Sequence, residues 1–274
     1  MPHTLAGQTA LITGGGRGIG RAVAEELARH GVNVVVTARS GREVHDTARA
    51  LNALGANALG IVADIAMPDD VRKVVEEAVD EFGTIDILVN NAAMLQPVGL
   101  AWEVDADEWA YTIHVNLIGV YRLCHAILPL MIEEGAGRII NVSSGAARPT
   151  STTVGWTAYS SSKAALDQFT RILAVEAQPH GISVNAVYPG VTDTRMQADI
   201  RGLTPDQFPS VGRFQGFHER GELRDPREPA ELVFWLCTSA ARDVTGQILD
   251  INDLAVRERV ARDLGRPLLP GPNA

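Results

Sequence analysis

The fold is decided by the stretch Thr9-Ala10-Leu11-Ile12-Thr13-Gly14-Gly15-Gly16-Arg17-Gly18-Ile19-Gly20. Its first five residues form a short apolar run typical of a buried strand, and the residues from Gly18 onward have helical apolar spacing. The glycines follow the spacing G-x-x-x-G-x-G rather than G-x-G-x-x-G. Such a loop lets backbone N–H groups approach a pyrophosphate at the N-terminus of a helix. A structural turn is the alternative, but the strand-loop-helix context favours a dinucleotide site.

The same alternation of strand and helix continues along the chain. Apolar and β-branched runs predict seven strands, at Thr9–Thr13, Val32–Thr37, Leu59–Ala63, Ile85–Asn90, Arg138–Val142, Ser183–Val187 and Gln247–Ile251. Helical periodicity predicts the intervening helices, at Gly18–His30, Glu43–Leu54, Asp69–Phe82, Ala106–Glu133, Ala158–Gln178 and Pro229–Ser239. Strands that are apolar on both faces are covered by helices on both sides. The pattern predicts one α/β domain, a doubly wound seven-stranded parallel sheet of the Rossmann type.

Two segments depart from this rhythm. Between Thr194 and Glu228 several glycines and prolines interrupt any sustained periodicity. This segment follows a strand C-terminus, the edge where open α/β sheets bind ligands, so we expect a substrate lid at about residues 195–228 of a domain spanning 1–253. Residues 254–274 form a C-terminal extension, either a short solvated helix or a cover for a neighbour's site, with an extended or disordered end from Gly265.

The end of the second strand indicates which dinucleotide binds. NAD-binding proteins place an acid there, about 20 residues after the glycine loop, to hold the ribose 2′-hydroxyl. Here the residues are Thr37-Ala38-Arg39-Ser40, with no carboxylate. The Arg39 guanidinium suits a 2′-phosphate, and Arg17 in the glycine loop adds a second cation. The sequence therefore favours NADP(H) over NAD(H).

The candidate catalytic group is a tyrosine and a lysine in one predicted helix. Tyr159 and Lys163 are four residues apart, so their side chains lie on one helix face. A tyrosine with a pKa near 10 is a slow acid or base at neutral pH unless a nearby ammonium favours the phenolate. Lys163 supplies that charge, and a hydroxyl from Ser143 or Ser144 can hold the substrate oxygen.

Taken in order, these motifs resemble those of the short-chain dehydrogenases/reductases. The resemblance runs from Thr9 to about Asp253 and rests on Thr13–Gly20, Asp64, Asn90-Asn91-Ala92-Ala93, Asn116, Ser144, Tyr159–Lys163 and Pro189–Thr194. It implies hydride transfer between a nicotinamide cofactor and a carbonyl or alcohol. The family's usual choice of the second serine selects Ser144 over Ser143.

The resemblance also assigns roles to individual residues. It implies a catalytic set of Ser144, Tyr159, Lys163 and Asn116, in which Asn116 anchors a proton-relay water. It implies contacts of Asp64 near the adenine and of Thr194 near the nicotinamide amide, with Asn90 steadying the central sheet. The full set expected to bind cofactor is Gly14, Gly16, Arg17, Gly18, Ile19, Gly20, Arg39, Ser40, Asp64, Ile65, Asn91, Ala92, Tyr159, Lys163, Pro189, Gly190, Val191 and Thr194.

The sequence departs from the family pattern in three places, the first near the cofactor and the other two near the substrate. Ala93 replaces a usual glycine, the segment between Ser144 and Tyr159 is about two residues longer than usual, and Leu249–Asp253 replaces a common Asp-Gly-Gly ending. The C-terminal half is similar to sepiapterin reductases and microbial benzil (α-diketone) reductases. That similarity implies a substrate anchor at Asp250, for which a strand-end carboxylate bonded to backbone is the alternative. Trp156 is expected either to line the substrate pocket or to pack in the core, and His114 to be an ordinary helix residue.

Composition restricts the classes of function. A net charge of −9 without a basic patch argues against nucleic-acid and anionic-membrane partners. The two cysteines lie in apolar segments, so neither a disulfide framework nor a metal site is expected. With no signal-like start and no apolar run of about 20 residues, a cytoplasmic enzyme is expected, as a homodimer or homotetramer by family resemblance. The leading hypothesis is reduction of a ketone, diketone or pterin side-chain carbonyl; oxidation of a secondary alcohol, or a catalytically silent NADP(H) sensor, are the alternatives.

Overall fold

The central sheet has seven strands, all parallel, in the order β3-β2-β1-β4-β5-β6-β7. The computed structural model describes residues 5–272. The strands are β1 Thr9–Thr13, β2 Asn33–Ala38, β3 Ala58–Val62, β4 Ile87–Asn90, β5 Gly137–Val142, β6 Ile182–Tyr188 and β7 Ile248–Asp250. The predicted single α/β domain with a seven-stranded, doubly wound parallel sheet is confirmed.

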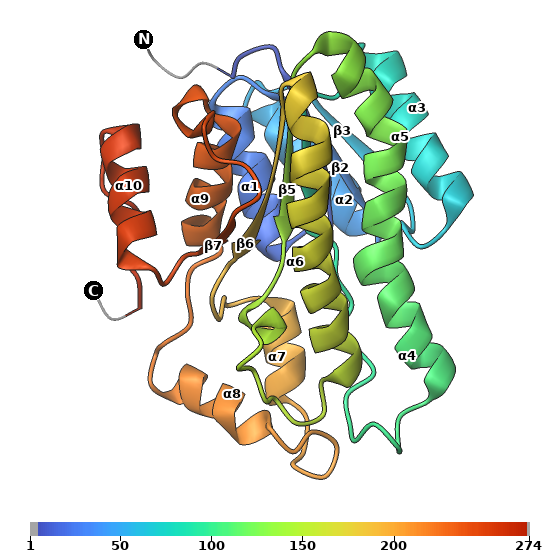
Figure 1. Ribbon diagram of the computed structural model, residues 1–274, viewed down its shortest axis with the longest axis vertical. Coiled ribbons are helices and arrows are strands. Elements are labelled where there is room, and N and C mark those ends of the chain that lie inside the picture. Colours follow the sequence, from blue (N-terminus) through green and yellow to red (C-terminus); the bar gives the residue numbers. More distant parts are fainter. Residues whose placement is uncertain (1–4, 273–274) are drawn as a thin grey trace.

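Helices cover both faces of the sheet, as its doubly apolar strands require (Figure 1). In β2 the side chains alternate: Val34 and Val36 join the core on one face, and Val35 joins the core on the other. The first face is covered by α1 Gly18–Arg29, α2 Gly41–Ala53 and α9 Arg227–Cys237. The second is covered by α3 Pro68–Phe82, α5 Gly119–Glu134 and α6 Thr157–Ala177.

The helix predicted at 106–133 is interrupted by a π turn. It consists of α4 Ala106–Ile113, the π turn His114–Ile118 and α5. Within the described part of the chain, this continuous helix, Ala106–Glu134, is also the one segment long and apolar enough to cross a membrane. Leu123 and Ile127 from it are fully buried in the protein core, which accounts for its apolar composition.

The connection around the sheet reverses between β1 and β4. The chain winds outward from β1 through β2 to β3, then returns to the other side of β1. Two crossovers therefore leave in opposite directions and open a crevice at the carboxyl ends of β1 and β4. Hydrogen bonds join these ends, because the Thr13 hydroxyl accepts the backbone N–H groups of Asn91 and Ala92, each at 3.0 Å.

The segment expected to be an irregular lid contains two short helices. These are α7 Arg195–Arg201 and α8 Val211–Glu219, which pack against each other beside the carboxyl end of β6 (Figure 1). The interrupted periodicity of this segment did not predict these two helices. Of its glycines and prolines, Gly212 and Gly216 lie within α8, and the others lie between the two helices or after α8. Phe214 of α8 is buried among other aromatic side chains.

The C-terminal extension packs on its own chain. Its helix, α10 Leu254–Leu264, contacts α9 and buries Val260 completely, so it is not simply solvated. Beyond α10 the backbone is irregular, and Glu231 of α9 holds it by accepting from the Leu269 N–H and by an ion pair with Arg266. This segment places Gly271 beside the crevice of the same chain.

Candidate active site

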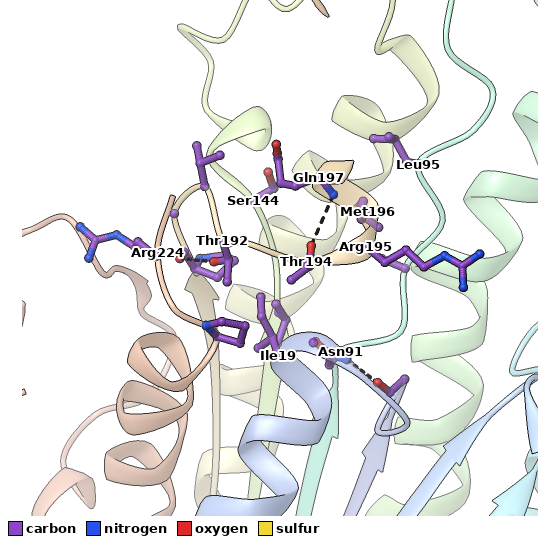
Figure 2. Close-up of a pocket in the computed structure, with 18 of the residues that line it drawn as sticks. Ile19, Asn91, Leu95, Ser144, Thr192, Thr194, Arg195, Met196, Gln197 and Arg224 are labelled. Carbon is purple, nitrogen blue, oxygen red and sulfur yellow. Dashed lines mark hydrogen bonds between the residues drawn. The ribbon is translucent and has the colours of Figure 1, made fainter. Parts of the chain in front are cut away.

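A cavity of about 1570 Å³ lies at the carboxyl ends of the strands. It is lined by the glycine loop, the ends of β2, β4, β5 and β6, and by α7 and α8; Figure 2 shows Ile19, Asn91, Ser144 and Met196 around one hollow. Nearly all residues predicted to bind cofactor or substrate line it. Gly20 and Asn116 are the predicted site residues that do not, and both are buried directly behind its wall.

The glycine loop is shaped so that a ligand can come close to its backbone. Gly14 and Gly18 have φ of +64° and +55°, which other residues rarely adopt. A Cβ on Gly20 would lie 2.4 Å from the Gly14 carbonyl oxygen, so only glycine fits where the loop enters α1. The Asn91 side-chain amide donates to the carbonyl oxygens of Thr13 and Gly14 at 2.9 and 3.2 Å. The loop is thus fixed with its N–H groups at the N-terminus of α1, where an anion is stabilised.

The two predicted phosphate-binding arginines stand at one end of the cavity, in different environments. Arg39 is exposed at the end of β2, beside Tyr111. Arg17 donates to the Glu43 carboxylate at 3.0 Å, and Arg195 from α7 lies 4.0 Å from the same carboxylate. Sequence reasoning missed Glu43 because it lies in the first turn of α2, beyond the strand end where an acid was sought. The acid neutralises part of the positive charge at this end.

Asp64 and Thr194 both line the cavity. Asp64 accepts from the Tyr111 hydroxyl at 2.8 Å and from the Ala66 N–H at 2.9 Å. The first of these hydrogen bonds is the main cause that raises the pKa of Tyr111. Thr194 caps α7 by accepting from the Gln197 N–H at 3.5 Å, as Figure 2 shows, and faces Gly18. The cavity therefore runs from Asp64 past the glycine loop to the start of α7.

Tyr159 and Lys163 lie side by side in the wall opposite the glycine loop, where α6 begins. Both are buried, and the Lys163 ammonium lies 5.9 Å from the centre of the Tyr159 ring. Lys163 donates to the Val142 carbonyl oxygen at 2.7 Å, which fixes its position against the end of β5. Burial lowers the pKa of Lys163 to about 8. Burial raises the pKa of Tyr159, and a hydrogen bond with Ser144 opposes this rise.

Of the two serines, Ser144 is the one whose hydroxyl lies beside that of Tyr159. Its hydroxyl accepts the Ala146 N–H at 3.2 Å and interacts with the hydroxyl of Tyr159. Ser143 also borders the cavity but is buried, with its hydroxyl directed 3.5 Å from the Lys163 carbonyl oxygen. The geometry therefore brings the hydroxyls of Ser144 and Tyr159 together, with the Lys163 ammonium close behind them.

The comparisons with known proteins agree with this site. The family model described as short chain dehydrogenase matches residues 8–203. The chain belongs to this family. As a short-chain dehydrogenase it is an oxidoreductase, and the match covers the glycine loop and the tyrosine and lysine of α6.

Two curated relatives and two solved structures illustrate the relationship. The 3-oxoacyl-(acyl-carrier-protein) reductase FabG of Vibrio cholerae is 36% identical over 252 residues, covering 90% of this chain and 97% of FabG. The short-chain reductase protein NovJ of Streptomyces niveus is 36% identical over 244 residues, covering 89% and 92%. A short-chain type dehydrogenase/reductase from Mycobacterium marinum superposes with a TM-score of 0.81 at 29% identity, and gox2181 with 0.82 at 28%. Each structural match covers 90% of this chain and 95% of the other.

In this short-chain dehydrogenase, Asn116 lies in the π turn, one layer behind the cavity. Its side-chain oxygen accepts the Met94 N–H at 2.7 Å, and its amide donates to the Met94 carbonyl oxygen and to the Ser162 hydroxyl. These bonds hold the Asn116 side chain in place behind the cavity wall. A π turn inserts an extra residue into a helix and is frequent at functional sites. His114, in the same turn, is exposed and outside the cavity lining, as expected of an ordinary helix residue.

Asn90 steadies the short-chain dehydrogenase sheet from behind the site. Its amide donates to the Asn141 side-chain oxygen at 2.9 Å, which links β4 to β5. It also donates to the sulfur of Cys124, a buried free cysteine of α5. Across residues 5–272, no group of three or more His, Cys, Asp and Glu side chains is arranged to hold a metal ion.

Trp156 serves both roles that the sequence left open. It is buried, yet it lines the cavity next to Tyr159. Its ring centre lies 4.8 Å from that of Phe214 and 5.3 Å from those of Phe208 and Tyr159. This aromatic wall lies beside the hydroxyls of Tyr159 and Ser144.

Asp250 lines the cavity, but its carboxylate is not free. One oxygen accepts from the backbone and side chain of Asn252, and the other forms an ion pair with Arg148. The guanidinium of Arg148 also lies over the Tyr188 ring, 5.4 Å from its centre. The hydrogen bond from the Asn252 backbone agrees with the alternative of a strand-end carboxylate. The ion pair with Arg148 could not be predicted from the sequence, because the partners are 102 residues apart.

Proposed function

We propose that this chain is an NADP(H)-dependent carbonyl reductase that converts a ketone, diketone or pterin side-chain carbonyl to the alcohol. One observation carries the proposal: the hydroxyls of Ser144 and Tyr159 and the ammonium of Lys163 meet in one wall of a cavity whose other wall is a glycine loop. The name of the relative FabG supports it, since a 3-oxoacyl group is a ketone. The same group of side chains serves alcohol oxidation in reverse.

The described residues fit a nicotinamide dinucleotide. The loop leaves no room for a side chain at Gly20, and its φ-positive glycines open the backbone toward the cavity. The pyrophosphate would lie against this loop, with Arg39 and Ser40 at the adenosine 2′-phosphate and Asp64 near the adenine. Pro189, Gly190, Val191 and Thr194 would hold the nicotinamide end. When bound, the reduced cofactor supplies a hydride to the carbonyl carbon.

The protein's own side chains would manage the proton. The Ser144 hydroxyl donates to the substrate oxygen and stabilises negative charge as it develops there. The Tyr159 hydroxyl protonates that oxygen. The Lys163 ammonium stabilises the resulting phenolate, which offsets the effect of burial on the tyrosine pKa. A water held by the main chain at Asn116 would return a proton to Tyr159.

The remaining cavity wall indicates the body of the substrate. Trp156, Phe214 and Phe217 form an aromatic side, and Met196 and Ile200 of α7 continue it. This wall favours a carbonyl compound with an aromatic or other apolar substituent. We propose that residues 195–228 act as the substrate lid, since α7 and α8 carry most of that wall.

Assembly and location belong to the same proposal. On the outer sides of α5 and α6, which run side by side in Figure 1, Tyr121, Ile172 and Val175 are at least half exposed. Exposed apolar side chains on neighbouring helices are typical of a protein interface. A homodimer or homotetramer of a soluble cytoplasmic enzyme, acting on a small molecule without nucleic-acid or membrane partners, is the assembly that we propose.

Initial rates of cofactor oxidation test the proposal. NADPH and NADH are supplied in parallel with 3-oxoacyl thioesters, benzil, sepiapterin and simple ketones, and Tyr159→Phe is the control. We expect turnover of at least one carbonyl class with NADPH, and loss of that turnover in the variant although NADPH still binds. Tight NADPH binding without turnover of any carbonyl, or of matching alcohols with NADP, would instead support a sensor.

A further inference from the structure

A buried acid lies directly behind the catalytic lysine. Asp167 follows Lys163 by four residues in α6, so the two side chains are neighbours on one helix face. Both are almost completely buried, at 3% and 2% exposure. The mechanism above does not use Asp167, and a buried carboxylate is costly unless hydrogen bonds or an opposite charge stabilise it.

Tyr188 provides the hydrogen bond. It is the last residue of β6, and its hydroxyl donates to the Asp167 carboxylate. Tyr188 is also held from the far side, because the Arg148 guanidinium lies over its ring and Asp250 holds Arg148. A continuous set of contacts therefore runs from the end of β7 to the acid behind the lysine.

The charges of Asp167 and Lys163 stabilise each other. Burial lowers the pKa of Lys163, and the charge of Asp167 opposes this. Burial likewise raises the pKa of Asp167, against the hydrogen bonds of Ser143 and Tyr188 and the charges of Arg171 and Lys163. Each charge is thus favoured by the other in a site where water stabilises neither.

We propose that Asp167, held in place by Tyr188, is a positioning residue that keeps Lys163 charged during turnover. The inference rests on the proposed function, since it needs Lys163 to act as a cation beside Tyr159. The groups facing this pair are Tyr159, Asp167 and Arg171 on α6, Ser143 at the end of β5, Tyr188 on β6 and Arg148 beyond it. Asp167 touches neither cofactor nor substrate, because it does not line the cavity.

The test is the pH profile of kcat/KM for Asp167→Asn, which removes the charge and keeps the shape. Neighbouring positions on one helix face bring side chains within several ångströms, where an opposite charge shifts a pKa by about one unit or more. The alkaline limb set by Lys163 should therefore move from about pH 8 to about pH 7. The variant would then lose about eightfold in kcat/KM at about pH 8.5 and very little at about pH 6. A merely structural role would lower kcat/KM equally at every pH, and that result, or an unmoved limb, would overturn the inference.

Two further variants secure the interpretation. Glu176→Gln removes a carboxylate from an exposed site on the same helix and should leave the limb unchanged. Tyr188→Phe removes the hydrogen bond that stabilises the Asp167 charge, so its limb should move in the same direction as that of Asp167→Asn; it carries the test if Asp167→Asn does not fold. If Tyr159→Phe retains turnover, the proposed function fails; if only the limb stays in place, the role of Asp167 alone fails.

Discussion

Replacing Arg39 with glutamine is expected to weaken NADPH binding about tenfold and to leave NADH binding within about twofold. Arg39 is exposed at the end of β2, where it hydrogen-bonds the neutral Tyr111 side chain rather than a carboxylate. Its positive charge is therefore not neutralised by a neighbouring acid and can attract the 2′-phosphate that distinguishes the two cofactors. The change removes the charge and keeps a polar side chain.

The expected loss of NADPH affinity depends on how exposed each arginine is and on whether an acid competes with the phosphate for it. A hydrogen bond to a charged group contributes about 1.5–3 kcal/mol, and solvent screening at an exposed site favours the lower end, which corresponds to about tenfold. Arg17 is already paired with Glu43 at 3.0 Å, with side chains 54% and 29% exposed. A pair of this kind contributes about 0–1 kcal/mol, so the phosphate must compete with Glu43 and Arg17→Gln should cost only about threefold.

Fluorescence titration of each variant with NADPH and NADH measures the two affinities. Arg42→Gln is the matched control, since Arg42 lies three residues further on in the first turn of α2, is 91% exposed and does not line the cavity. It should leave the ratio of the two Kd values unchanged. Equal loss of NADPH and NADH affinity in Arg39→Gln, or no loss of either, would refute the assignment of Arg39 to the 2′-phosphate.

Three other predictions follow from the same geometry. Gly20→Ala forces a methyl group against the Gly14 carbonyl oxygen, so the variant should lose about 1–3 kcal/mol of unfolding free energy in urea titrations and most of its NADPH affinity. Gly145→Ala, which has open space around it, should lose neither, and equal behaviour of the two variants would refute the role of the glycine loop in holding the cofactor. The proposed function needs the Lys163 cation, and burial lowers the pKa of Lys163 to about 8, so wild-type kcat/KM should be constant below about pH 7 and fall as pH rises through about 8; a plateau continuing to about pH 10 would contradict this. Trp156→Ala should lower the unfolding free energy by about 3–5 kcal/mol and raise KM for aromatic carbonyls more than for small ones; an unchanged KM ratio would remove Trp156 from the substrate wall.

The sheet could be predicted from the sequence because its pattern is local. Runs such as Val34-Val35-Val36 predict both that a strand forms and that helices cover both of its faces. The glycine loop and the spacing of Tyr159 and Lys163 are local signals as well, so the elements that carry them were predicted correctly.

The features that sequence missed depend on contacts between distant segments. Arg148 and Asp250 meet only because the chain after β5 and the end of β7 border one cavity. The hydrogen bond of Tyr188 to Asp167 likewise joins β6 to α6. The helices α7 and α8 were missed because glycines and prolines obscured their short periodicity, whereas burial of aromatic side chains such as Phe214 stabilises them.

The most direct test of the central claim is the transfer of deuterium from NADPH deuterated at C4 of the nicotinamide. The enzyme is incubated with the labelled cofactor and the best carbonyl substrate, and the alcohol product is analysed by mass spectrometry and NMR. A reductase acting through Tyr159 should place one deuterium on the carbinol carbon, and Tyr159→Phe should form almost no labelled product although it binds NADPH normally. Labelled product formed equally well by Tyr159→Phe would contradict the account.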